Sequence, residues 1–135
     1  MADLNGCAWM PPEAWTVLPR ILPQSAIWTG RINGQVVCIA GLTTIFPHLA
    51  EAWTYLHPDA VAHRFWLHRR VSRTLHSYVE ASELWRVQAV AETDKPAAKA
   101  WLEKLKFKAE SVMPMAGPLG ESMTRYVWFP RGING

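Results

Sequence analysis

The positive charge of the chain is concentrated in one segment that is predicted to be helical. Four arginines and three histidines fall within residues 63–76: Arg64, Arg69, Arg70, Arg73, His63, His68 and His76. Cationic side chains on one helix can bind phosphate, either on a small ligand or on a nucleic acid. They can equally contact an acidic protein surface or form a solvated helix face. No recognition motif for DNA accompanies them, so the phosphate of a small ligand or a protein partner is preferred to a DNA-reading role.

Other side chains that often perform chemistry are not spaced as metal or hydrolase sites. His63 and His68 are five positions apart, whereas residues that share one face of a helix lie three or four apart. The serines of the same segment lack the Gly-x-Ser-x-Gly turn of a nucleophile. Cys7 and Cys38 form no Cys-x-x-Cys pair, so neither a disulfide nor a zinc site is expected. Cys38 lies in an apolar run and is predicted to be an inert core residue.

Eight tryptophans are distributed along the whole chain. Large aromatic rings usually fill a core, but tryptophan is also enriched at protein interfaces. Trp9 and Trp15 lie among four prolines, at 11, 12, 19 and 23, in a segment that cannot form one long helix. We therefore predict Trp9 and Trp15 as partner-binding residues, with burial in the core as the alternative.

The composition indicates a single folded domain. The chain has 135 residues, of which 50% are hydrophobic and 19% charged, with a formal net charge of +3. These values exclude intrinsic disorder, and no apolar run is long enough to span a membrane. The first residues lack the features of a signal peptide, so the protein is expected inside a cell. We predict an irregular arm over residues 1–25, one domain over 26–130 and a short tail over 131–135.

Alternating and helical hydrophobic patterns define the expected elements. Strands are predicted over residues 27–32, 35–42, 50–56, 84–91, 107–115 and 123–129, and helices over 58–81 and about 95–105. Asn33-Gly34 is typical of a hairpin turn, and Asp94 is expected to cap the second helix. The buried stripe of the long helix is predicted to contain Val61, Phe65, Val71, Leu75, Tyr78 and Val79. The order predicts an α+β fold, a mixed sheet of about six strands with the two helices on its faces.

The element order and several local motifs resemble the GNAT acyltransferases over residues 26–129, with the first strand and opening helices of that fold cut short. The motifs are Trp28-Thr29-Gly30, Asn33-Gly34-Gln35-Val36-Val37, Ala52-Trp53-Thr54-Tyr55-Leu56, the run Ala100–Phe107, and Gly117-Pro118-Leu119-Gly120 before an aromatic strand. Within this family the chain is most similar to the small GNAT-like proteins of short-tailed bacteriophages, which are internal virion or head-assembly proteins.

The resemblance implies an acyl-CoA site, but with altered motifs. The family's phosphate-binding loop, Gln/Arg-x-x-Gly-x-Gly/Ala, aligns with residues 57–62, where His57 and Ala60 replace the first residue and the middle glycine. Asp59 adds a carboxylate where the pyrophosphate would lie, and like charges repel. If acyl-CoA binds, the resemblance places it against Trp53, Thr54, Tyr55, Ala60, Val61, Ala62 and Arg64.

A second family motif supplies a tyrosine that protonates the departing thiolate, and Leu102 stands in its place. Leucine cannot transfer a proton, so this general acid is missing. The remaining candidates for a general base are Glu51 and Glu92, whose alternative role is that of solvated carboxylates at strand ends.

The resemblance and the altered motifs lead to two main hypotheses. In the first, the protein acts in virion assembly or as a minor virion component, without acetyltransferase activity or a cofactor, and binds other phage structural proteins or itself. It would then be found in the virion or the host cytoplasm. In the second, it is an acyl-CoA-dependent N-acetyltransferase that uses acetyl-CoA and acts on an amine of a protein or small molecule. The sequence is compatible with either hypothesis, an enzyme or a protein without catalysis.

Overall fold

The computed structural model describes residues 25–133. Within these residues the chain forms six strands, one 3-10 helix and two α-helices. In chain order they are β1 (Ser25–Ile32), β2 (Gln35–Phe46), β3 (Leu49–Leu56), η2 (Pro58–His63), α2 (Arg64–Glu80), β4 (Arg86–Glu92), α3 (Pro96–Lys104), β5 (Lys108–Met113) and β6 (Met123–Trp128). This order confirms the predicted α+β class, the six strands and the two helices.

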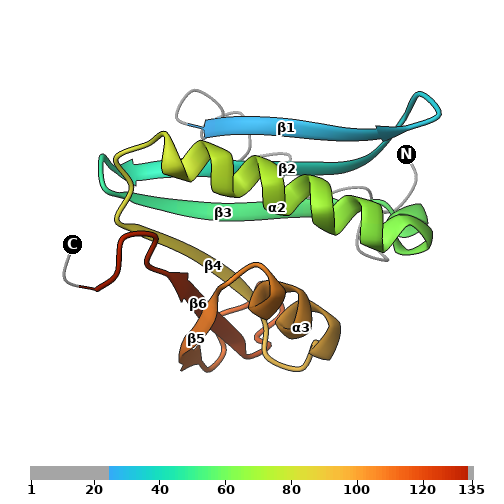
Figure 1. Cartoon of the computed structure of the whole chain (residues 1–135). Coiled ribbons are helices and arrows are strands. Elements are labelled where there is room, and N and C mark those ends of the chain that lie inside the picture. The colour runs from blue at the N-terminus through green and yellow to red at the C-terminus, as the bar shows by residue number, and fades with distance from the viewer. Residues whose placement is uncertain (1–24, 134–135) are drawn as a thin grey trace.

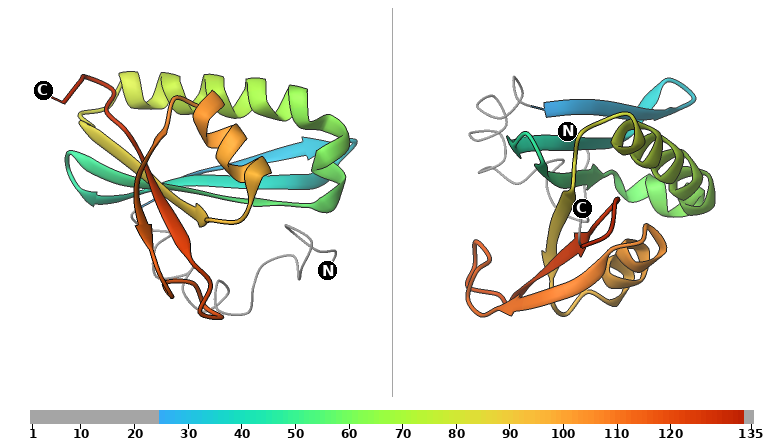
Figure 2. Two further views of the ribbon diagram at one scale, coloured as in Figure 1. Left: turned by 90° about the horizontal axis from the view of Figure 1, so that it is seen from below. Right: turned by 60° about the vertical axis from the view of Figure 1, so that its left-hand side comes forward.

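All six strands belong to one mixed sheet, with the order β1-β2-β3-β4-β6-β5. Every neighbouring pair is antiparallel except β3 and β4, which are parallel because the long helix crosses over between them. Figure 1 shows α2 lying across β1, β2 and β3, and the left view of Figure 2 shows α2 and α3 on the same side of the sheet. Within the part of the chain that is described, no helix is long and apolar enough to cross a membrane.

The long helix buries a stripe with a spacing of four residues, formed by Leu67, Val71, Leu75 and Val79. The prediction was wrong for Phe65, which is 70% exposed. Phe65 precedes Leu67 by two residues, so its side chain is rotated by about 200° around the helix axis and lies away from the buried stripe.

The prediction was also wrong at the two ends of that stripe. Val61 is 66% exposed, because residues 58–63 form a 3-10 helix with three residues per turn, which changes the phase of the pattern. Tyr78 is 41% exposed, although its ring contacts Trp28 of β1 edge-on at 5.3 Å.

Other boundaries also differ from the prediction, including the start of β4 at Arg86 and the end of β5 at Met113. Strand β2 continues to Phe46, because the β-branched residues Thr43, Thr44 and Ile45 favour an extended backbone up to the turn at Pro47. Helix α3 has Lys95 at its N-cap position, and no side chain caps it, so Asp94 does not have the predicted capping role.

The core lies between the sheet and the two helices. It contains Leu42 and Ala50 from the sheet, Leu75 and Val79 from α2, and Leu105 and Phe107 at the end of α3, with Trp101 and Leu102 partly buried against it. A second cluster joins Cys38 to Ala60 and Leu67. Cys38 is buried, as predicted, and burial raises the pKa of its thiol, which suits an inert core residue.

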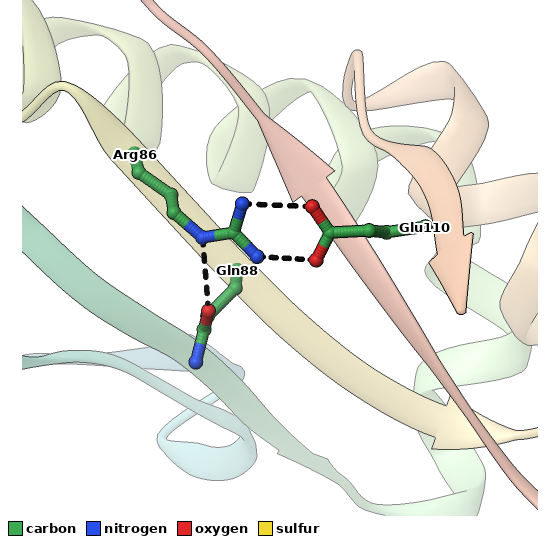
Figure 3. A network of polar contacts seen from close by, with 3 residues as sticks. All are labelled: Arg86, Gln88 and Glu110. Carbon is green, nitrogen blue, oxygen red and sulfur yellow. Dashed lines mark hydrogen bonds and ion pairs between the residues drawn. The ribbon is translucent and has the colours of Figure 1, made fainter. Parts of the chain in front are cut away.

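A polar network connects β4 to β5 across the intervening strand β6 (Figure 3). Arg86 of β4 donates from Nη1 to Oε2 of Glu110 at 2.8 Å, from Nη2 to the other carboxylate oxygen, and from Nε to Oε1 of Gln88 at 3.1 Å. Ala109 and Ser111 pair with consecutive residues of β6, and Glu110 between them forms a β-bulge with no paired residue on that strand. The pair lowers the pKa of Glu110, but both side chains are partly solvated, so its energy is small, about 0–1 kcal/mol.

Candidate functional site

The central feature of the site is a short parallel ladder. Strands β3 and β4 pair only at Leu49–Arg86, Ala50–Val87 and Glu51–Gln88. The remainder of β3, residues 52–56, still pairs with β2, while the remainder of β4 pairs with β6. The two central strands therefore part after Glu51, and Figure 1 shows β4 running away from β3 toward β6.

A cavity of about 770 Å³ occupies this part of the molecule. Its wall is formed by the parting strands, by β1 and β2, and by the facing sides of α2 and α3. The residues that contribute are mainly apolar, and four tryptophans are among them: Trp28, Trp53, Trp66 and Trp101. The volume lies within the range of about 300–1,000 Å³ that is usual for pockets that bind small molecules.

Among the residues that the structure describes, Glu51 is the only carboxylate that lines this cavity. It lies at the last paired position before the strands part. Burial raises the pKa of the Glu51 carboxyl, and the positive charge of Arg125 on β6 partly offsets that effect. A carboxylate with a raised pKa in a cavity is suited to accept a proton from a bound substrate.

Residues 53–55 of β3 alternate between the two faces of the sheet, as the sequence predicted. Trp53 packs on Gly41 and donates from Nε1 to Oγ1 of Thr43 at 2.8 Å, and its ring lies 5.8 Å from that of Tyr55. Thr54 is oriented to the other face, where it donates to the carbonyl of Ile39 at 3.2 Å. All three predicted cofactor-binding residues of this strand, Trp53, Thr54 and Tyr55, line the cavity.

The segment aligned with the phosphate-binding loop is a 3-10 helix whose first N–H groups are already bonded. His57 is buried, and its Nδ1 accepts a hydrogen bond from the backbone N–H of Asp59 at 3.1 Å. The N–H of Ala60 bonds to the carbonyl of His57 at 2.9 Å. These two N–H groups are therefore not available to an anion while the cap is formed.

The other predicted residues of this segment lie away from the cavity wall. Ala60 is buried in the second core cluster, while Val61, Ala62 and Arg64 are exposed. None of the four is part of the cavity wall that the structure describes. The guanidinium of Arg64 lies 4.8 Å from the ring centre of Phe65.

The basic residues of α2 divide between two surfaces. Arg70 lines the cavity, and its guanidinium lies 5.5 Å from the ring centre of Trp66. Arg69 and Arg73 instead border a shallow depression with His68, Ser72 and His76. Only Arg70, of the four predicted arginines, is in a position to contact a ligand in the cavity.

Glu92, the second predicted base, lies outside the cavity wall. Its carboxylate is 3.7 Å from Nζ of Lys95, in a pair that is open to solvent on both sides. Among the described residues, no group of three histidine, cysteine or carboxylate side chains is arranged to hold a metal ion. Trp9 and Trp15, the predicted partner-binding residues, lie outside the described residues.

Leu102, which replaces the family's tyrosine, lies in the cavity wall on α3, and Trp101 beside it donates from Nε1 to Nδ1 of His68 at 3.1 Å. This bond connects α3 to α2 next to the cavity. Among the described residues that line the cavity, Tyr55 is the only tyrosine. Sequence reasoning missed Trp28, Trp66 and Trp101 as site residues, because only the arrangement of the helices over the parted strands brings them together.

The chain matches no known family profile, and no characterised protein sequence matches it. Its structure is similar to that of the ribosomal-protein-S18-alanine N-acetyltransferase from Escherichia coli, with a TM-score of 0.75 and 17% identity over 98% of this chain and 85% of that one. Ard1 from Thermoplasma volcanium has a TM-score of 0.74 with 13% identity, over 89% of this chain and 80% of that one. The putative acetyltransferase yncA from Salmonella typhimurium, solved with its cofactor acetyl-CoA, has a TM-score of 0.70 with 21% identity, over 90% and 73%. At these identities the similarity establishes the fold, which is that of the GNAT acetyltransferases.

Proposed function

We propose that the protein binds an acyl-CoA in the opening between β3 and β4 and transfers the acyl group to an amine, with Glu51 as the general base. The observation that carries this proposal is the end of the β3–β4 ladder at Glu51, beside a cavity of about 770 Å³. Solved structures of the same fold include a putative acetyltransferase with acetyl-CoA and a ribosomal-protein acetyltransferase in complex with coenzyme A.

The residues present fit one end of acyl-CoA better than the other. The thioester and the arm that carries it fit the apolar cavity, where Trp53, Thr54 and Tyr55 form one wall. The diphosphate fits less well, because Asp59 adds a negative charge and His57 occupies a backbone N–H that could hold an anion. Arg31 and Arg70 are the cations among the described lining residues, and an arginine guanidinium can bind phosphate. We therefore expect binding, but weaker than a glycine-rich loop would support.

The roles of the protein's own groups follow from the geometry. Glu51 takes a proton from the ammonium form of the acceptor, so that the free amine can attack the thioester carbonyl. The attacking nitrogen releases its second proton to solvent, the carbon–sulfur bond breaks and the amide forms. The thiolate takes a proton from water, or from the Tyr55 hydroxyl, which then regains one from water, since Leu102 has none to give. The apolar wall excludes water from the thioester, which limits hydrolysis.

Titration calorimetry with coenzyme A and acetyl-CoA tests the binding step. We expect saturable binding of both, and no heat at millimolar ligand would overturn the proposal. The chemical step is tested by following thiol release with a panel of primary amines. Glu51→Gln should keep its affinity for acetyl-CoA and lose about 10²–10⁴-fold in rate.

Glu92→Gln is the matched control, since it makes the same change at a paired carboxylate outside the cavity. It should keep the wild-type rate. An equal loss of rate in both variants would argue against Glu51 as the base.

A second proposal is a role in phage virion assembly without catalysis, and the part of it that concerns catalysis is supported by two observations. The cavity wall offers Leu102 where the family has a proton donor, and the aligned phosphate loop is closed by its own cap. The phage resemblance itself rests on sequence alone, and the comparisons with solved structures add nothing to it. Mass spectrometry of purified particles tests this proposal, together with the absence of acyl transfer in the assays above.

A further inference from the structure

The interface between α2 and the sheet contains an unfilled region. Ala40 of β2, Ala52 of β3 and Val71 of α2 pack against the two core clusters, yet all three remain partly accessible. Protein interiors are normally packed to the density of organic crystals. The accessibility of these side chains arises because they border the same cavity that opens between β3 and β4.

Small residues on the sheet create the hollow. Where β2, β3 and β4 face the helices, the cavity is bordered by Ala40, Ala52, Ala89 and Ala91, whose side chains end at Cβ. Larger apolar side chains close the other sides, namely Leu42, Leu67, Val71, Leu75, Leu102, Leu105 and Phe107. A polar ligand group placed there would lose its water without gaining hydrogen bonds, which is unfavourable, whereas an aliphatic chain would not.

The charged side chains of the cavity wall lie outside this apolar hollow. Among the described lining residues they are Arg31 near the end of β1, Glu51 where the strands part, and Arg70 on α2. Glu51 is next to Ala52, the residue with which the hollow begins on β3. Their side chains lie on opposite faces of β3, and the opening between β3 and β4 joins the two faces. A thioester held in the opening beside Glu51 would therefore have its acyl chain directed through it toward the apolar region on the helix side.

We infer that the acyl group is an aliphatic chain longer than acetyl, which lies in the hollow between α2 and the alanines of the sheet. This inference rests on the proposed function and specifies its substrate. An acetyl group ends close to the thioester and would leave the hollow unfilled. Each additional buried methylene should strengthen binding by up to about fourfold.

Calorimetry on the full chain with acetyl-, hexanoyl- and octanoyl-CoA tests the inference. We expect octanoyl-CoA to bind at least tenfold more tightly than acetyl-CoA, with hexanoyl-CoA between them. Ala40→Leu should fill the hollow from β2 and remove that preference while acetyl-CoA still binds. Ala97→Leu, the same change at an exposed position of α3, should leave the preference unchanged.

The outcomes separate the two proposals. Equal affinities for the three thioesters would overturn the inference and leave acyl transfer standing, and the hollow would then have another occupant. Absence of binding for all three would overturn the proposed function and the inference with it. Octanoate binding as tightly as octanoyl-CoA would also overturn the inference, because the cavity would then serve a free acid. If Ala40→Leu does not fold, Val71→Phe fills the same space from the helix and should show the same loss of preference.

Discussion

Gly41 allows Trp53 to form one wall of the cavity, and this contact can be tested by one methyl group. A Cβ added at Gly41 would lie 2.6 Å from Cε2 of Trp53, well inside the contact distance of two carbon atoms. Gly41 is buried in β2, and Trp53 is held in place by its hydrogen bond to Thr43 at 2.8 Å. In Gly41→Ala the indole must therefore move away from the sheet, and it loses that hydrogen bond.

The cost follows from the kind of change. Overpacking of a filled site typically costs about 1–3 kcal/mol in the free energy of unfolding. For a chain of this size that corresponds to a fall in Tm of roughly 3–12 °C. Thermal denaturation followed by circular dichroism measures it. The displaced indole should also weaken acyl-CoA binding, since Trp53 lines the cavity.

Two controls make the reasoning refutable. Gly30→Ala is the same change on β1, where the nearest atoms to the new methyl would be Cβ of Cys38 at 3.3 Å and Cδ1 of Leu67 at 3.7 Å, so a small effect is expected. In the Trp53→Ala background the Gly41→Ala change should cost almost nothing, because the clashing ring is gone. If Gly41→Ala is as stable as the wild type, or equally costly in both backgrounds, the assigned contact is wrong.

Two further results are expected. Burial raises the pKa of Glu51 above its ordinary value of 4.5, so the folded protein holds that proton more tightly than the unfolded chain and the wild type loses stability as pH rises through the raised pKa. Glu51→Gln should thus have a higher Tm than the wild type at neutral pH, and this difference in Tm should disappear below about pH 4.5. A difference in Tm that does not depend on pH would contradict the burial of this carboxyl. His57→Ala removes the cap and releases the N–H of Asp59, and it should lower the free energy of unfolding by about 0.5–2 kcal/mol, measured as a lower midpoint of chemical denaturation. Calorimetry should show that the affinity for coenzyme A is not weakened. A weakened affinity would mean that His57 itself holds the ligand.

Much of the fold was predictable because it depends on local patterns. The alternation along residues 50–56 predicted that Glu51, Trp53 and Tyr55 share a face, and the structure confirms it through the bond from Trp53 to Thr43. Asn33-Gly34 predicted the first hairpin, and both residues have the positive φ angles that this turn requires. The exposure of Val61 was not predicted, because a hydrophobic residue near a helix start gives no sign that it lies in a 3-10 turn.

The site was only partly predictable, because it depends on contacts between distant segments. Glu51 and Glu92 are equivalent in the sequence as acidic residues at strand positions. They differ only in the fold, where the first lies beside the opening of the sheet and the second pairs with Lys95 in solvent. The hollow beneath α2 likewise depends on alanines from three strands, which no sequence motif brings together.

The brief pairing of β3 with β4 has a consequence for the mechanics of the molecule. Three residue pairs join a unit of β1–β3 to a unit of β4–β6 within the sheet, and contacts between α2 and α3 provide a second connection. Amide protons at this junction should exchange with solvent sooner than those of the antiparallel hairpins on either side. A molecule bound between the two units would connect them, so its binding should slow that exchange on both sides and raise the melting temperature with the logarithm of its concentration above Kd.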